Sequence, residues 1–356
     1  MILVARSEPR LAVIVMAAVA LSVIFATLLV EARMQTRLRA QALERNAAEA
    51  DFRAQLLATR AEGYLRLADG LSRVPPLAGL DRVAATGIDP LDGSTREQWL
   101  ARLSTIFLST LRAEEVVFQA RYLDATGREV VRLDRLDGRL ARTEAAALQN
   151  KSARAYVRTA VARGVAPAFL TPVEMNRERN VLDPRRIPTL RAIAPALGPD
   201  GRVLGFVVLN LDLRPMLADV APESGPRDLP RIVDALGRYV VTLDPAGIEA
   251  MARGLPGAAW SDLPGLADRA ADDTAFPFAH AEASRDGEAL VVATPLRFAR
   301  MVPAADYMLI WTRPADRVDA LLRASWIDSL LAGVVAIAAT GGMALLLGRR
   351  MARPLR

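Results

Sequence analysis

Two long runs of apolar residues, one near each end of the chain, dominate the hydrophobic pattern. Residues 11–30 and residues 329–348 are each 20 residues long and contain no charged side chain. At about 1.5 Å of rise per residue, a helix of this length covers roughly 30 Å, the thickness of the hydrocarbon core of a bilayer. Both runs are therefore predicted to be transmembrane helices. The first is longer than the roughly 7–15 apolar residues of a signal peptide, so we expect it to be retained as an anchor.

The charges beside these runs predict the orientation of the chain. Two spans place residues 1–10 and residues 349–356 on the same side, and the second of these segments carries four arginines and no acid. The positive-inside rule makes that side the cytoplasm and leaves residues 31–328 in the periplasm of a bacterial inner membrane. The net charge of +6 divides into +1 for residues 1–30, +4 for residues 349–356 and +1 for the rest. The basic balance therefore reflects topology, and no nucleic-acid partner is expected.

Helical periodicity gives way to alternating patterns along the predicted periplasmic part. Residues 31–74 are rich in helix formers and predict a long stalk helix that ends at Pro75 and Pro76. A second helix is predicted to start at Ser94 or Thr95, with Glu97 placed for a capping box. The elements expected after it are a hairpin of strands 116–124 and 129–133, a helix at 143–163, and strands at 169–173, 189–197 and 203–211.

The same order of elements returns after a linker that is rich in Pro and Gly. The second set comprises a hairpin of strands 232–235 and 239–243, helix and loop over 246–271, and strands at 276–283, 289–295 and 307–311. A connecting helix at 314–328 then leads into the second span. The predicted fold class is α+β, with two tandem antiparallel-sheet domains, residues 75–222 and 223–313, on a long stalk helix between two transmembrane helices.

Several segments resemble a known family. The string from Arg121 to Arg132 (RYLDATGREVVR) is similar to the first hairpin of double-Cache, PAS-like periplasmic sensor domains of bacterial histidine kinases and diguanylate cyclases, and residues 148–156 and 188–210 resemble that family's helix and closing strands. The resemblance implies a membrane-distal and a membrane-proximal Cache domain. The tail 350–355 resembles the opening of a HAMP linker, which would continue into a kinase, cyclase or chemotaxis signalling domain. The chain is then either a fragment or has a separate output partner.

A candidate ligand site follows from the strands of the first domain. Side chains two residues apart on a strand share one face, and arginine binds carboxylates through two parallel hydrogen bonds. Arg121 and Arg191 are the central cations, and Lys151 with Tyr156 is expected to close over the ligand, a small anionic or zwitterionic metabolite such as an organic acid or an amino acid. The predicted ligand-binding residues are Gln119, Arg121, Lys151, Ser152, Tyr156, Arg191, Asn210 and Asp212.

A structural interpretation of these residues stays open beside the functional one. An arginine in a strand often pairs with a neighbouring acid, here Asp124, Glu129 or Asp212. The chain also departs from the family at residues 177–181, where a Gly is common, and at Val157, where an aromatic is common. The shape of the loop over the pocket, and with it the ligand class, is left open by these departures.

No catalytic residue, metal site or cofactor is predicted. His280 is the single histidine, the chain has no Cys, and neither an ATP-binding glycine loop nor a G-x-S-x-G motif is present. The leading hypothesis is a homodimeric transmembrane receptor that signals to a two-component histidine kinase. The alternatives are the input region of a diguanylate cyclase or chemoreceptor, and a membrane-anchored periplasmic scaffold or enzyme.

Overall fold

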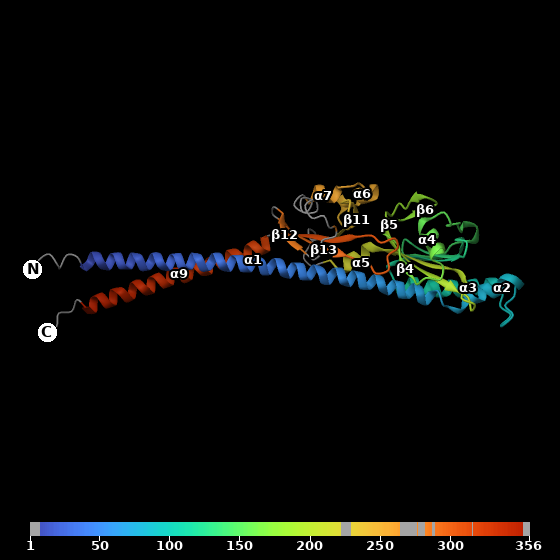
Figure 1. Cartoon of the computed structure of the whole chain (residues 1–356), viewed down its shortest axis with the longest axis horizontal. Helices are drawn as coiled ribbons and strands as arrows, with labels where there is room; N and C mark the ends of the chain where they lie inside the picture. Colours follow the sequence, from blue (N-terminus) through green and yellow to red (C-terminus); the bar gives the residue numbers. More distant parts are fainter. Residues whose placement is uncertain are drawn as a thin grey trace, which may run out of the picture. The chain divides into compact units, whose positions relative to one another are not determined.

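The chain divides into two compact units in the computed structural model, which describes residues 8–221, 229–263, 276, 282–286, 289–314 and 316–351. One unit contains residues 1–46, 287–289 and 314–356, and the other contains residues 47–286 and 290–313. The first unit consists mainly of parts of two long helices, α1 (Glu8–Leu71) and α9 (Asp316–Met351), and the second holds two larger sheets and a two-stranded one (Figure 1).

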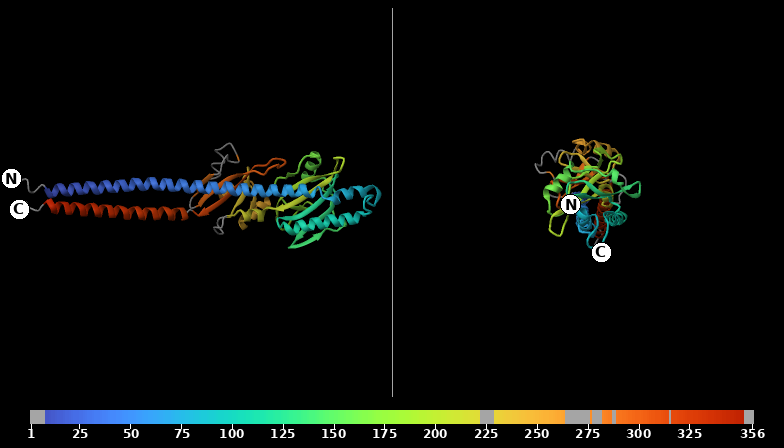
Figure 2. Two further views of the ribbon diagram at one scale, coloured as in Figure 1. Left: turned by 90° about the horizontal axis from the view of Figure 1, so that it is seen from below. Right: turned by 90° about the vertical axis from the view of Figure 1, so that its right-hand side faces the viewer.

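The helices of the first unit carry the two apolar runs. Residues 14–71 and 322–343 include stretches with mean hydropathy of 2.5 and 1.5, long and apolar enough to cross a membrane. Large apolar side chains such as Phe25 (69% exposed) and Val335 (66% exposed) point away from the protein, as expected for a surface that lipid covers. The two helices lie side by side in this unit (Figure 2), where the carboxylate of Glu31 accepts hydrogen bonds from the hydroxyls of Ser325, at 3.0 Å, and Ser329.

Three helices form one side of the second unit. The C-terminal part of α1 buries a stripe at helical spacing, from Ala50 through Leu57 to Leu71. The helix ends at Leu71, three residues before the predicted end at residue 74, and the two prolines instead open a short helix that was not predicted, α2 (Pro75–Thr86).

The next helix, α3 (Arg96–Ala113), begins after Thr95 as predicted, but its capping box uses Gln98 in place of Glu97. The reason is positional, because the third residue after a Thr95 cap is Gln98.

The first sheet is antiparallel and has the strand order β3-β2-β1-β9-β8-β4, with β5 also paired to β8. Its strands are β1 (Val117–Asp124), β2 (Glu129–Leu136), β3 (Arg139–Arg142), β4 (Phe169–Leu170), β5 (Glu174–Met175), β8 (Pro188–Leu197) and β9 (Val203–Asp212). A separate hairpin is formed by β6 (Arg177–Glu178) and β7 (Val181–Leu182). The predicted hairpin and closing strands are present, whereas β3, β5, β6, β7 and the following helix α5 (Leu213–Asp219) were not predicted.

The predicted helix at 143–163 is wrong at residues 143–144 and 148–154. Only a 3-10 turn (Ala145–Ala147) and the helix α4 (Ala155–Arg163) are helical, and α4 ends at Gly164 as predicted. The amide of Glu129 donates to the carbonyl of Gln149 and that of Lys151 donates to the carbonyl of Gly127, both at 2.9 Å. These bonds hold the intervening chain against the β1–β2 hairpin, so tertiary pairing overrides a helix-compatible composition.

The second sheet has the strand order β11-β10-β14-β13-β12. Its strands are β10 (Arg231–Asp234), β11 (Tyr239–Thr242), β12 (Glu282–Asp286), β13 (Ala289–Leu296) and β14 (Tyr307–Pro314), and its helices are α6 (Pro245–Arg253) and α7 (Ala258–Asp262). Of the strand predicted at 276–283, residues 277–281, including His280, lie outside the described residues. The predicted α+β class with two sheets and a long N-terminal helix is confirmed. The exact domain boundaries stay predictions.

Candidate functional site

A row of buried polar side chains crosses the first sheet. The strand register places Gln119 of β1 opposite Asp134 of β2 and Asn210 of β9, and Asn210 opposite Arg191 of β8. Directly opposed residues of antiparallel strands share a face, so these four side chains form one row, and all four are buried. Buried polar groups cost free energy unless they are partnered, so a row of this kind in an otherwise apolar sheet needs a reason.

The two predicted arginines meet at one aromatic ring. Arg121 lies two residues from Gln119 on the same face, and its Nη1 donates to the hydroxyl of Tyr156 at 3.0 Å. The guanidinium of Arg191 lies over the Tyr156 ring, 4.8 Å from the ring centre. Tyr156 belongs to α4, which packs on this face through Val157 against the apolar cluster around Phe206. The helix therefore closes one end of the polar row.

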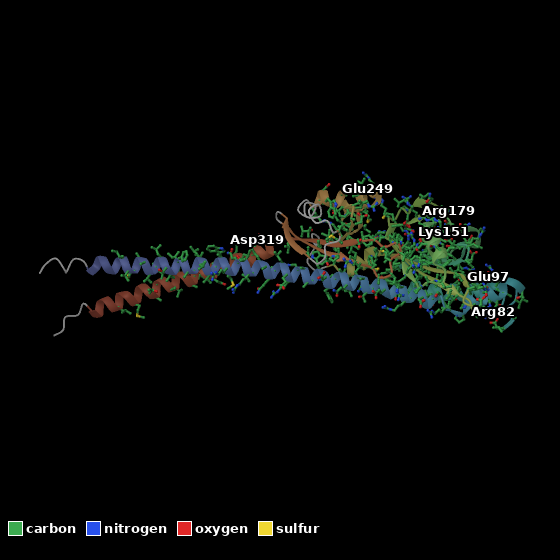
Figure 3. The ribbon with its side chains drawn as sticks, viewed as in Figure 1. Arg82, Glu97, Lys151, Arg179, Glu249 and Asp319 are labelled. Atoms are coloured by element: carbon green, nitrogen blue, oxygen red, sulfur yellow. The ribbon has the colours of Figure 1, made fainter. Side chains whose placement is uncertain are left out.

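A glutamate that was not predicted sits at the centre of the cations. The carboxylate of Glu178, on the β6–β7 hairpin, accepts hydrogen bonds from Arg121 Nη2 at 2.6 Å, Lys151 Nζ at 3.0 Å and Arg132 Nη1 at 3.1 Å. Gln119 and Gln149 each donate to it at 3.2 Å. Lys151 and Arg179, the turn residue next to Glu178, lie in the same part of the domain (Figure 3). Glu178 thus has the surroundings that a bound carboxylate would have.

The charges of this cluster shift one another's pKa values. Burial alone would raise the pKa of Glu178, but Arg121, Arg132 and Lys151 outweigh it and hold the pKa at about 2. Burial, with repulsion from Arg121, lowers the pKa of Lys151. Burial would also lower the pKa of Arg121, but Tyr156 and then the neighbouring carboxylates outweigh that effect and raise it. The cluster is a tightly coupled set of buried ions.

Arg191 forms a second, outer ion pair. Its Nη1 donates to the carboxylate of Glu174 at 3.2 Å; the Arg191 side chain is 2% exposed, whereas that of Glu174 is 51% exposed. The Nε of Arg191 and the Oδ1 of Asn210 are buried and have no hydrogen-bond partner in the described part of the chain. The site therefore holds polar groups whose bonding capacity is not used.

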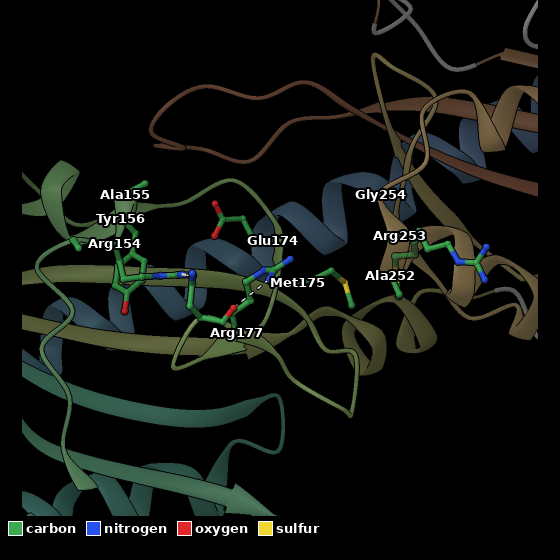
Figure 4. A pocket seen from close by; sticks show the side chains of 12 residues that line it. Arg154, Ala155, Tyr156, Glu174, Met175, Arg177, Ala252, Arg253 and Gly254 are labelled. Carbon is green, nitrogen blue, oxygen red and sulfur yellow. Dashed lines mark hydrogen bonds between the residues drawn. The ribbon is translucent and has the colours of Figure 1, made fainter. Parts of the chain in front are cut away.

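A cavity of about 520 Å³ opens beside these residues (Figure 4). Tyr156 and Glu174, the two side chains that contact Arg191, form part of its wall, together with Met175 and with residues 251–254 from the second sheet domain. Its volume lies within the range of roughly 300–1,000 Å³ that small-molecule sites occupy. Arg191 therefore contacts two side chains that line a cavity large enough for a small metabolite.

The structure brings six of the eight predicted ligand-binding residues to this face of the sheet: Gln119, Arg121, Lys151, Tyr156, Arg191 and Asn210. It separates the other two from the cluster. Ser152 is exposed in a turn that Asn150 stabilises, because the Asn150 side chain accepts from the Ser152 amide. Asp212 caps α5, and its carboxylate pairs with Arg214 at 2.6 Å.

The sequence also allowed each strand arginine to form an ion pair with Asp124, Glu129 or Asp212. Of Arg121 and Arg191, only Arg121 forms such a pair. Arg121 Nε lies 3.2 Å from the carboxylate of Glu129, while Arg191 pairs with Glu174 and not with Asp212. Within the described residues, no group of three or more His, Cys, Asp or Glu side chains could hold a metal ion.

Sequence reasoning missed Glu178 and Arg132. Arg132 lies opposite Arg121 in the hairpin, but a bulge between Tyr122 and Leu123 shifts the register, so counting back from the turn at Gly127 would have placed Val131 there. Glu178 stands in a segment without a periodic pattern, and only its place in the loop expected over the pocket gave a signal.

Comparison with known proteins supports the sensor fold. Residues 92–248 match the family model of the bacterial histidine kinase sensor domain. The extracellular domain of a putative histidine kinase matches with a TM-score of 0.61 at 19% identity, covering 81% of this chain and 95% of that chain. A domain of a putative sensory box/GGDEF family protein from Vibrio parahaemolyticus matches with a TM-score of 0.59 at 18% identity, covering 78% and 98%.

The ligand-binding domain of the Campylobacter jejuni chemoreceptor Tlp3 matches with a TM-score of 0.50 at 10% identity, covering 80% of this chain and 97% of that chain. No curated protein matches the sequence. These three matches cover nearly the whole of each of the three domains, and at these identities they establish the fold alone. The resemblance to Cache-type sensor domains is thereby confirmed: the chain has their fold, and its residues 92–248 match the sensor domain of bacterial histidine kinases, while the double-Cache arrangement and the HAMP linker stay predictions.

Proposed function

We propose that this chain is the input part of a two-pass transmembrane receptor, which binds a small anionic or zwitterionic metabolite at the Arg121–Arg191 site and signals to a cytoplasmic output module. The observation that carries the proposal is the pair of buried guanidinium groups that share Tyr156 at the wall of a 520 Å³ cavity. Fixed cations in a desolvated site favour ligands with a carboxylate. We favour a two-component histidine kinase as the output, since residues 92–248 match that class of sensor domain.

The ligand class is also supported by a structural relative. The Tlp3 ligand-binding domain was solved in complex with L-valine, a zwitterion with one carboxylate. A carboxylate of this kind would meet Arg121, and the remainder of the ligand would lie along Tyr156 toward Arg191. The role of the region is then recognition and not catalysis.

Calorimetry on the full chain in detergent, with a panel of organic acids and amino acids, tests the site. Arg121→Ala and Arg191→Ala should each weaken binding of the cognate ligand at least tenfold, because each removes a buried cation from the carboxylate. Arg202→Ala is the matched control, since Arg202 forms an exposed ion pair with Asp81 and should not affect binding. Unchanged affinity in both site variants would remove these arginines from the ligand site.

Two further experiments test the topology and the output. A reporter that is active only in the periplasm should be active when it is fused near residue 200. Activity of a cytosol-specific reporter at that position would contradict the proposal.

The gene sequence beyond codon 356 tests the output module. An in-frame kinase domain would support the histidine kinase, and a GGDEF or chemotaxis signalling domain would replace it as the output. Crosslinking in membranes tests the proposed homodimer.

A further inference from the structure

The carboxylate of Glu178 occupies the position that a ligand carboxylate would need. It is held by three cations from three segments, Arg121, Arg132 and Lys151, at 2.6–3.1 Å. We propose that Glu178 is an internal substitute for the ligand: a small organic carboxylate displaces it from these cations and thereby releases the β6–β7 hairpin. This inference rests on the proposed function, because it takes the Arg121 cluster to be the ligand site.

The hairpin is built so that it can move about its base. β6 and β7 pair with each other as a separate two-stranded sheet, joined by the turn residues Arg179 and Asn180, both at positive φ. At the base, the side chain of Asn176 donates to Asp183 at 2.8 Å, and both residues are buried. Beyond the base, the hydrogen bonds and ion pairs between the hairpin and the rest of the described domain are those of Glu178 and a 3.1 Å hydrogen bond from Arg154 to Asn180. A segment attached in this way opens at lower cost than one packed by apolar side chains.

Charge balance explains why an anion should be needed for release. The cluster without the hairpin contains Arg121, Arg132 and Lys151 as cations and two acids as partners. Glu129 pairs with Arg121 and Asp134 pairs with Arg132, so one positive charge remains, which Glu178 neutralises. Withdrawal of Glu178 alone would leave an unpaired buried cation, at substantial cost. A ligand carboxylate removes that cost, so ligand binding and hairpin release are coupled.

A second role for Glu178 makes the opposite prediction. If Glu178 recognised the amino group of a zwitterionic ligand, replacing it would weaken the binding of amino acids. If Glu178 competes with the ligand, replacing it should strengthen the binding of carboxylates. The substitution Glu178→Gln separates the two roles because it removes the charge and keeps the size of the side chain.

The test uses the full chain in detergent with sodium acetate as the probe and sodium chloride of equal ionic strength as the reference. In chloride, Glu178→Gln should melt at a lower temperature than the wild type. Acetate should raise the melting temperature of Glu178→Gln. The acetate concentration that gives half of this increase should be at least tenfold lower than for the wild type. Glu97→Gln, which alters an exposed ion pair with Arg142, is the control and should behave as the wild type. If Glu178→Gln does not fold, Glu178→Asp, which keeps the charge on a shorter side chain, should show a smaller effect in the same direction.

Limited trypsin digestion reports the hairpin directly. Cleavage after Arg177 and Arg179, located by mass spectrometry, should be faster in Glu178→Gln than in the wild type, while cleavage after the exposed Arg253 should not change. Two results would overturn the inference: no acetate response and no faster cleavage in Glu178→Gln, or weaker binding of L-alanine by Glu178→Gln than by the wild type.

Failure of this inference can be told apart from failure of the proposed function. If Arg121→Ala and Arg191→Ala weaken metabolite binding while Glu178→Gln behaves as the wild type, the ligand site stands and the internal competitor does not. Acetate could instead raise the melting temperature of Glu178→Gln while the arginine variants bind metabolites with unchanged affinity. The cations around Glu178 would then bind an anion, but they would not be the metabolite site.

Discussion

Neutralising Glu178 should change the pH dependence of stability in a defined window. The pKa of this carboxyl is about 2 in the folded protein against an ordinary 4.5. The folded state therefore releases this proton more readily than the unfolded state does. The resulting stability is fully present above pH 4.5 and is lost as the pH falls toward 2.

The size of the effect follows from the same two values. At about 1.4 kcal/mol per pKa unit, the difference corresponds to about 3 kcal/mol. The Glu178 side chain is only 25% exposed, so solvent screening removes little of this value. We expect the free energy of unfolding of Glu178→Gln to be about 3 kcal/mol lower than that of the wild type at pH 7. The two free energies should converge near pH 2.

Urea unfolding followed by tryptophan fluorescence, at several pH values between 2 and 7, measures the difference. The comparison must be between variants, because other carboxyls with lowered pKa values, such as that of Asp183, titrate in both proteins. A difference that is constant with pH, or that is absent at pH 7, would refute the assignment of Glu178 as an ionised, cation-bound carboxylate.

Two further predictions concern the sheet and the membrane helices. Gly205→Ala should lower the free energy of unfolding by about 1–3 kcal/mol in urea titrations, because an added Cβ would lie 2.1 Å from the carbonyl oxygen of Leu123 on the paired strand. The pair Thr27→Cys and Gly333→Cys should form an intramolecular disulfide under mild oxidation, detected by gel mobility, since a Cβ at Gly333 lies 4.0 Å from that of Thr27.

Both predictions have controls within the chain. Gly70→Ala should be neutral or slightly stabilising, because an added Cβ there meets nothing within 4 Å in the described structure and the position is helical. Thr27→Cys with Gly342→Cys should not crosslink within the chain, since a Cβ at Gly342 also has no neighbour within 4 Å among the described atoms. The absence of native cysteine keeps the crosslinking free of background.

Local patterns in the sequence predicted the parts of the fold that local physics determines. The β1–β2 hairpin has a tight turn in which the Asp124 side chain accepts from the amide of Thr126 and Gly127 adopts φ of +86°. Alternation on either side then places Gln119 and Arg121 on one face. These residues could be proposed as site candidates because the side-chain period of a strand is two.

The parts that sequence could not supply depend on contacts between distant segments. Lys151 lies in a stretch whose composition suits a helix, but its amide donates to the carbonyl of Gly127 and the residue is not helical. Glu178 contacts Arg121 across 57 positions, from a loop without periodicity. A charged residue in such a loop has no local signature of burial, so its partners appear only when the chain has folded.

An internal carboxylate would also set the ligand concentration at which the sensor responds. If the contacts of Glu178 favour the closed hairpin by at most about 3 kcal/mol, the open form is populated in roughly one molecule in 100, and the apparent Kd of a ligand rises by the same factor. A weak anion such as acetate then competes with Glu178 in the wild type only at high concentration, because it makes no contact beyond the cations. A cognate ligand must gain additional contacts, and Tyr156 and Arg191 beside the cavity can supply them. The competing glutamate thereby turns a general anion site into one that responds only to a ligand that fills the pocket.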